Sequence, residues 1–158
     1  MTQLIATNSV TAIVGLGLTG LSVARYLHNK GCAFVMVDSR QSPPMLAKFK
    51  QEFPAAAIEL GPLNVETLTA SVEMVVSPGV ALSTTAVAAA IEAGVPAIGD
   101  IELFSRAAQA PIIAITGSNA KSTVTTLVGL MAEYAGVKVA VGGNIGIPAL
   151  DLLAAADT

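Results

Sequence analysis

The chain has 158 residues, of which 53% are hydrophobic and only 4% aromatic, and its formal net charge at pH 7 is -3. Its 8 lysine and arginine residues are scattered rather than clustered, which excludes the basic surface of a protein that binds nucleic acid or an anionic membrane. An abundance of Ala, Val, Ile and Leu favours an α/β protein whose parallel strands are covered on both faces.

The sequence carries no sign of export or of membrane insertion. The apolar segment near the N-terminus has no basic stretch before it, so we expect no secretory signal. The uncharged run over residues 74–91 is interrupted by Pro78 and Gly79, which predicts a strand, a loop and a helix rather than a membrane span. Cys32 is the only cysteine and cannot form an internal disulfide. We therefore expect a cytoplasmic protein that binds small molecules, without nucleic acid and without membrane insertion.

Strand and helix patterns alternate over residues 11–99. A β-branched run at 11–15 predicts a buried strand, and the helical pattern after it ends at Gly31, before a second strand at 33–38. Strand, glycine turn, helix and strand make one βαβ unit. Further along we expect a helix at 44–53, strands at 57–60 and 74–76, a helix at 85–93 and a strand at 95–99. These elements predict a doubly wound, Rossmann-like parallel sheet.

After residue 99 the alternation of helix and strand patterns begins again. We expect a short helix and linker at 99–110, a strand at 111–116, a helix at 121–134, a strand at 137–143 and a helix from 144 to 158. The domain boundary is placed between Arg106 and Pro111, which gives a Rossmann-like domain at 1–106 and the first βαβ unit of a P-loop ATPase domain at 107–158. A parallel sheet with so few strands leaves its edges and apolar faces uncovered. The chain is therefore expected to be cut short.

A glycine-rich turn stands between the first strand and the first helix. Gly15, Gly17 and Gly20 fit the pattern G-x-G-x-x-G, and Asp38 closes the next strand, as in a dinucleotide-binding unit. Glycines allow a tight turn and close approach of a ligand, and free N–H groups at a helix N-terminus favour anionic oxygens. The functional interpretation is a nucleotide site in which Asp38 accepts hydrogen bonds from a nucleoside. The alternative is a turn that serves only helix–strand packing, with Asp38 as the cap of a turn.

A second candidate loop, TGSNAKST, stands between the strand predicted at 111–116 and the helix predicted at 121–134. A lysine at that place can reach nucleotide phosphates, and the hydroxyl after it can bind Mg²⁺. The loop is shorter than the standard phosphate loop, and Ala120 stands where the usual motif has glycine. Alanine costs about 1 kcal/mol there if the backbone needs a positive φ. The alternative is a helix N-terminus capped by Ser118 or Asn119.

A third loop, at 142–148, follows the last predicted strand, at the end where ligands of parallel sheets bind. Its Asn144 can donate a hydrogen bond to a phosphate. It can equally stand in the left-handed position of a glycine-rich turn, and both interpretations stay open.

Six segments carry a resemblance to a known enzyme family. They are IVGLGLTGLSVARYL, VDSR, SPGVAL, GDIELF, ITGSNAKSTVTTLVG and GGNIGIPALDLL. In this order and spacing they resemble the N-terminal part of the D-glutamate-adding Mur ligases of peptidoglycan synthesis. That family has a UDP-sugar-binding domain, a central ATPase domain and a C-terminal domain that closes over the site. The resemblance implies that the first loop binds UDP-N-acetylmuramoyl-L-alanine rather than NAD.

The resemblance also implies particular site residues. Those for the UDP-sugar are Leu18, Thr19, Asp38, Ser39, Arg40, Gly79 and Asn144. Those for ATP are Gly117, Ser118, Asn119, Ala120, Lys121, Ser122 and Thr123. Among these, Lys121 is implied as the catalytic cation at the phosphates and Ser122 as a ligand of Mg²⁺.

The implied reaction is ATP-dependent formation of an amide bond. The carboxylate of UDP-N-acetylmuramoyl-L-alanine attacks the γ-phosphate, and the amine of D-glutamate then attacks the resulting acyl phosphate. The family's remaining catalytic groups and its D-glutamate site lie downstream of Thr158, so we expect this chain alone to be inactive. We expect the full-length protein to be monomeric and the shorter chain to be able to self-associate.

Two other functions remain open at this point. The NAD-binding domain of a dehydrogenase would explain the glycine turn and Asp38 but would leave TGSNAKST unexplained. A non-catalytic UDP-sugar-binding protein would need a stable fold of this length and a gene that stops after Thr158.

Overall fold

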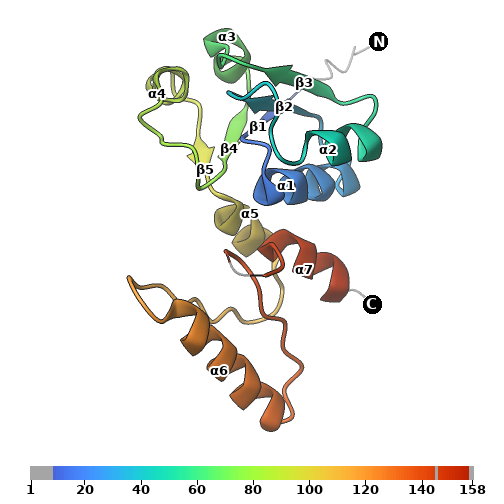
Figure 1. Cartoon of the computed structure of the whole chain (residues 1–158), viewed down its shortest axis with the longest axis vertical. Coiled ribbons are helices and arrows are strands. Elements are labelled where there is room, and N and C mark those ends of the chain that lie inside the picture. The colour runs from blue at the N-terminus through green and yellow to red at the C-terminus, as the bar shows by residue number, and fades with distance from the viewer. Residues whose placement is uncertain (1–8, 145, 157–158) are drawn as a thin grey trace, which may run out of the picture. The chain divides into compact units, whose positions relative to one another are not determined.

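The computed structural model describes residues 9–144 and 146–156, which form two compact units divided between Asp100 and Ile101. Figure 1 shows the helices and strands of both units along the chain. Within the described residues, the first unit contains all the strands and the second is helical and irregular. The domain boundary predicted between Arg106 and Pro111 stays a prediction.

Five parallel strands make the sheet of the first unit, in the order β3-β2-β1-β4-β5. They are β1 (Thr11–Val14), β2 (Phe34–Asp38), β3 (Ala57–Leu60), β4 (Glu73–Val76) and β5 (Ala97–Ile98). In the central strand β1, Thr11 lies opposite Phe34 of β2 on one side and Glu73 of β4 on the other. The predicted α/β fold with a parallel sheet is confirmed for this unit.

Four helices connect these strands: α1 (Leu18–Asn29), α2 (Leu46–Glu52), α3 (Val65–Thr69) and α4 (Thr85–Glu92). The sequence predicts three of them, whereas α3 was missed. This short helix begins after Asn64, whose side chain accepts a hydrogen bond from the N–H of Glu66 at 2.9 Å. An asparagine at the N-cap was therefore the signal that could have identified it.

Different helices bury the two faces of the sheet. One face carries Ala12, Val35 and Met74, which pack with residues of α3 and α4 into one hydrophobic cluster. The other face carries Ile13 and Met36, both fully buried, and α1 and α2 lie together on that side (Figure 1). Because side chains alternate along a strand, a sheet covered on both faces requires the uninterrupted apolar runs that the sequence has.

The second unit corrects part of the prediction. Its helices α5 (Asp100–Ala107) and α6 (Lys121–Tyr134) agree with the predicted ones. The last helix, α7 (Ala149–Ala156), begins later than the predicted residue 144, and the predicted helical residues 145, 157 and 158 lie outside the described residues. The strands predicted at 111–116 and 137–143 are wrong, because both segments are irregular. A parallel strand needs a neighbour with which to exchange hydrogen bonds, and neither segment has one in the described part of this unit. Ile113 is 70% exposed and Val137 57%, so the βαβ unit predicted here is not formed.

The uncharged run at 74–91 forms β4, a turn and α4, as the sequence predicts. Within the ranges that the structure describes, no helix is long and apolar enough to cross a membrane.

Candidate functional site

The site residues predicted in the first unit lie at the carboxyl ends of β1, β2 and β4, on the loops there and in the first turn of α1. The chain winds from β1 through β2 to β3 on one side and then places β4 and β5 on the other. The direction of winding therefore reverses between β1 and β4, which is where ligands of open α/β sheets bind. Leu18 and Thr19 follow β1, Ser39 and Arg40 follow β2, and Gly79 follows β4.

Asp38, the last residue of β2, buries its carboxylate against the glycine turn and is only 2% exposed. Oδ2 accepts hydrogen bonds from the backbone N–H of Leu16 at 2.6 Å and from Nη2 of Arg40 at 2.7 Å. Oδ1 accepts from the backbone N–H of Arg40 at 2.8 Å and from its Nε at 2.9 Å. A carboxylate has about four acceptor positions, and protein donors take them here. Asp38 thus fastens the glycine turn to Arg40, and its predicted role as an acceptor for a nucleoside stays a prediction.

These contacts also hold Asp38 in its ionised form. Burial acts to raise the pKa of its carboxyl group, but hydrogen bonds from the Arg40 side chain and from the N–H groups of Leu16 and Arg40, with the Arg40 charge, lower the pKa from 3.8 to about 2. The hydrogen bond to Asp38 in turn raises the pKa of Arg40. The pair is therefore charged at neutral pH.

The glycine turn brings the start of α1 close to the end of β1. Gly15 has a φ of 100°, which residues with a side chain rarely adopt. A Cβ atom on Gly20 would lie 2.0 Å from the carbonyl oxygen of Gly15. At Gly17, in contrast, an added Cβ would have no described atom within 4 Å. Packing therefore requires glycine at 15 and 20, whereas position 17 is open.

The residues around this turn present an accessible surface. Leu18 is 62% exposed, and the side chain of Arg40 is 52% exposed although Asp38 holds it in place. Ser39 and Gly79 are exposed and Thr19 is half-buried. The apolar side chain of Leu18 at the start of α1 and the fixed planar guanidinium of Arg40 on the loop after β2 are surfaces on which a nucleobase can pack. The first-turn N–H groups of α1 have no acceptor within the helix, which suits an anionic ligand.

Sequence reasoning did not single out Ser77, the first residue after β4. Its hydroxyl donates to the carbonyl oxygen of Gly15 at 3.0 Å, across 62 positions of the sequence. The only local signal was its place in the Ser-Pro-Gly turn, which does not reveal a distant partner.

The second candidate loop leads into α6. Lys121 folds back over this loop, and its Nζ donates to the carbonyl oxygens of Gly117 and Ser118, the latter at 3.4 Å. Ala120 is the N-cap of α6, with no capping hydrogen bond from its side chain, so the alternative cap by Ser118 or Asn119 is not formed. The ammonium group therefore stays at the loop, where the sequence predicts the phosphates.

Ala120 has the left-handed conformation, with a φ of 58° and a ψ of 8°. We expect Ala120→Gly to raise the free energy of unfolding by up to about 1 kcal/mol, because left-handed backbone costs alanine about 1–2 kcal/mol and the freedom of glycine in the unfolded chain cancels part of this gain. Urea denaturation of both proteins measures the difference. The matched control is Ala132→Gly within α6, which should lose about 1 kcal/mol. A loss of similar size at position 120 would contradict the strain.

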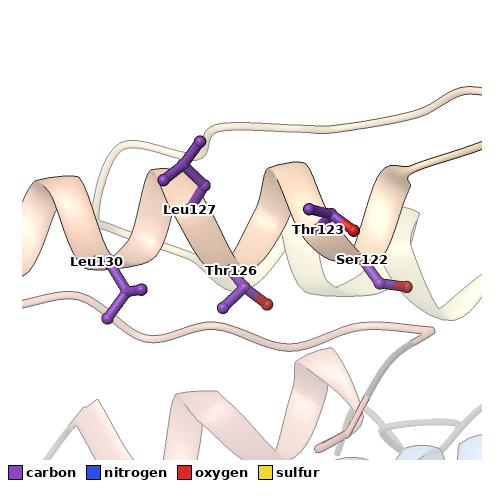
Figure 2. Close-up of a pocket in the computed structure, with 5 residues that line it drawn as sticks. All are labelled: Ser122, Thr123, Thr126, Leu127 and Leu130. Carbon is purple, nitrogen blue, oxygen red and sulfur yellow. The ribbon is translucent and has the colours of Figure 1, made fainter.

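Ser122 and Thr123 place exposed hydroxyl groups in the first turn of α6. With Thr126, Leu127 and Leu130 they line an open hollow of about 420 Å³, shown in Figure 2. All these residues belong to one helix, so the hollow is a face of α6 rather than an enclosed site. No group of three His, Cys, Asp or Glu side chains that could hold a metal occurs in the described ranges. A single hydroxyl fits a Mg²⁺ ion that arrives with phosphate oxygens and waters as its other ligands.

The third loop holds Asn144, which is exposed. The N–H of Gly143 donates to the carbonyl oxygen of Ile147 at 2.8 Å and closes the loop. Among its described residues, positive φ angles occur at Gly143 and Gly146. The alternative of a left-handed Asn144 is therefore not found, and its contact with a phosphate stays a prediction.

Comparison with known proteins identifies related sequences. Residues 9–99 match the family described as "Mur ligase MurD-like, N-terminal domain". The chain is 54% identical to the UDP-N-acetylmuramoylalanine--D-glutamate ligase of Saccharophagus degradans over 99% of its length, and 55% identical to the Pseudomonas fluorescens enzyme of that name over 96%. These alignments cover 36% and 34% of the relatives, so the chain spans about a third of their length.

Two solved structures share the fold at low identity. The UDP-N-acetylmuramate:L-alanyl-gamma-D-glutamyl-meso-diaminopimelate ligase from Neisseria meningitides has a TM-score of 0.55 at 19% identity, covering 89% of this chain and 45% of that one. A pseudomurein peptide ligase type C from Methanothermus fervidus has a TM-score of 0.53 at 19% identity, covering 81% and 26%. At this identity both support the fold alone.

Proposed function

Because this chain belongs to the MurD-like family of Mur ligases, we propose that the full-length protein joins D-glutamate to UDP-N-acetylmuramoyl-L-alanine while ATP becomes ADP and phosphate. The observation that carries the proposal is the 54% identity to a ligase of that name over 99% of the chain. The similarity includes both candidate loops, so the chain would contribute the UDP-sugar-binding domain and the nucleotide loop.

In this proposal the glycine turn and its neighbours bind the UDP part of the substrate. Leu18 and the guanidinium of Arg40 pack on the uridine, and Thr19 and Ser39 offer it hydroxyl groups. The N–H groups at the start of α1 face the diphosphate. The roles predicted for Gly79 and Asn144, at the diphosphate and sugar, belong to the same proposal.

The second loop serves the transfer of the phosphoryl group. A carboxylate oxygen of the UDP-sugar attacks the γ-phosphorus and ADP leaves; the amine of D-glutamate then attacks the acyl carbon, releasing phosphate and a proton. Lys121 exchanges the carbonyl oxygens of Gly117 and Ser118 for phosphate oxygens and neutralises their charge. Ser122 would hold Mg²⁺, which when bound supplies further neutralisation of charge on the phosphates.

Calorimetric titration of the 158-residue chain with UDP-N-acetylmuramoyl-L-alanine tests the first loop. We expect saturable one-to-one binding that Arg40→Ala weakens about tenfold or more, because a guanidinium packed on a ring contributes about 1–2 kcal/mol. The matched control is Lys30→Ala, which removes an equal charge just after the opposite end of α1 and should leave the affinity unchanged.

Other results would argue against the proposal. Equal weakening by both variants would indicate a general effect of charge rather than a site at Arg40. Saturable heat with NADH, and none with the UDP-sugar, would favour the dehydrogenase.

A further inference from the structure

One peptide group in the glycine turn is held on both of its sides by side chains, one at the end of β2 and one just after β4. The carbonyl oxygen of Gly15 accepts from the Ser77 hydroxyl at 3.0 Å, and the N–H of Leu16 donates to the Asp38 carboxylate at 2.6 Å. These two backbone groups belong to the same planar peptide, in which C=O and N–H point in opposite directions. We propose that Ser77 and Asp38 are positioning residues that clamp the Gly15–Leu16 peptide and hold the glycine turn in one shape.

The clamp continues the hydrogen bonding of the sheet beyond its last backbone pairs. The N–H of Gly15 donates to the carbonyl oxygen of Val37 in β2 at 2.8 Å. The N–H of Ser77 donates to the carbonyl oxygen of Val14 in β1 at 2.9 Å. At the next peptide the strands no longer supply backbone partners. Side chains replace them on the same two sides, so the order of the sheet extends one peptide further into the turn.

The Gly15–Leu16 peptide needs such a restraint because Gly15 has no side chain. Glycine lacks the Cβ that restricts ψ at other residues, so rotation about the Cα–C bond of Gly15, which turns this peptide, is less restricted than usual. On the α1 side, Gly20 packs closely against the Gly15 carbonyl oxygen, from which an added Cβ would lie 2.0 Å, but this contact is not a hydrogen bond. The two side-chain bonds are therefore what selects one orientation of the peptide.

The clamp is also tied to the exposed surface of the site. Asp38 bonds Leu16 with the oxygen that also accepts from Nη2 of Arg40. Asp38 is buried and Ser77 half-buried, so both act through the turn and Arg40 rather than as surface groups. The effect of Ser77 and Asp38 on nucleotide binding rests on the proposed function, whereas the clamp itself can be measured without any ligand.

Hydrogen exchange of the Leu16 amide is the direct test, because Ser77 does not bond that N–H. If the peptide is held as one unit, Ser77→Ala should speed exchange of the Leu16 amide about 2- to 10-fold, which is the loss of one ordinary hydrogen bond. The matched control is Ser71→Ala, since the Ser71 hydroxyl also donates to a backbone carbonyl, that of Thr67 at 2.9 Å. Exchange of the Leu16 amide in Ser71→Ala should equal that of the wild type.

Binding of UDP, measured by calorimetry, is the second readout. Ser77→Ala should weaken UDP binding about 2- to 10-fold, Ser77→Thr should restore it because the hydroxyl is retained, and Ser71→Ala should have no effect. Unchanged Leu16 exchange in Ser77→Ala would overturn the clamp, whatever UDP does. Faster exchange in a protein that does not bind UDP would support the clamp and contradict the proposed function instead.

Discussion

Replacing Gly20 by alanine is expected to lower the free energy of unfolding of the first unit by about 3 kcal/mol or more. The new Cβ would lie 2.0 Å from the carbonyl oxygen of Gly15 and 3.1 Å from its carbon. Overpacking usually costs about 1–3 kcal/mol, and this site lies at the upper end because the clashing atoms belong to a hydrogen-bonded backbone peptide rather than to a flexible side chain. Either α1 must move off β1 or the clamped peptide must turn. Thermal unfolding followed by circular dichroism should show a decrease in Tm on the order of 15 °C.

Gly17→Ala is the matched control within the same motif. Gly17 has a φ of -101°, which alanine adopts freely, and an added Cβ would have no described atom within 4 Å. Its free energy of unfolding should stay within about 0.5 kcal/mol of the wild type. Equal Tm values for the two variants would mean that close packing is not the reason for glycine at position 20.

Asp38→Asn is expected to cost about 2–3 kcal/mol of unfolding free energy at neutral pH. The amide has one acceptor oxygen instead of two, and in either orientation its NH₂ group would face a guanidinium nitrogen of Arg40 together with one backbone N–H, that of Leu16 or that of Arg40. A buried donor without an acceptor costs about 1–3 kcal/mol, and more when it is charged. Urea denaturation measures the loss. Glu92→Gln, which neutralises an exposed carboxylate, should change stability by less than about 0.5 kcal/mol.

The stability difference between the wild type and Asp38→Asn should shrink in acid. The pKa of Asp38 is lowered from 3.8 to about 2 in the folded protein. A lowered pKa stabilises the fold above the unfolded value, and this contribution is lost as the pH falls through the folded value. This shift in the pKa of Asp38 corresponds to about 2 kcal/mol of unfolding free energy. Denaturation curves between about pH 6 and pH 2 should show the loss, and a constant difference over that range would contradict the low pKa.

The first unit was predictable where its signals are local. Residues 11–14 and 34–38 are uninterrupted apolar runs flanked by turns, and such a run identifies a buried strand without knowledge of its partners. The same logic located the glycine turn and Asp38. The bond from Ser77 to Gly15 spans 62 positions and depends on two loops meeting where the winding reverses. No local pattern could have revealed it.

The second unit marks the limit of this reasoning. A helix satisfies its own backbone within the segment, so α6 was predictable from its sequence. A strand exists only through its neighbours, and the apolar runs at 111–116 and 137–143 have none among the described residues of this unit. The sequence predicted what a left-handed backbone at Ala120 would cost, but not that the backbone adopts it. The conformation of a single residue in a loop depends on how the chain enters the helix.

The ion pair at the end of β2 also determines the distance over which Arg40 can act. Its charge is balanced at 2.7 Å by a carboxylate that stays ionised, so the pair projects little net field into solvent. An anion would gain little electrostatic steering from it, and what remains is contact with a flat guanidinium and its unused N–H groups. Discrimination at this edge would then depend on the shape of the base rather than on the charge of the phosphates.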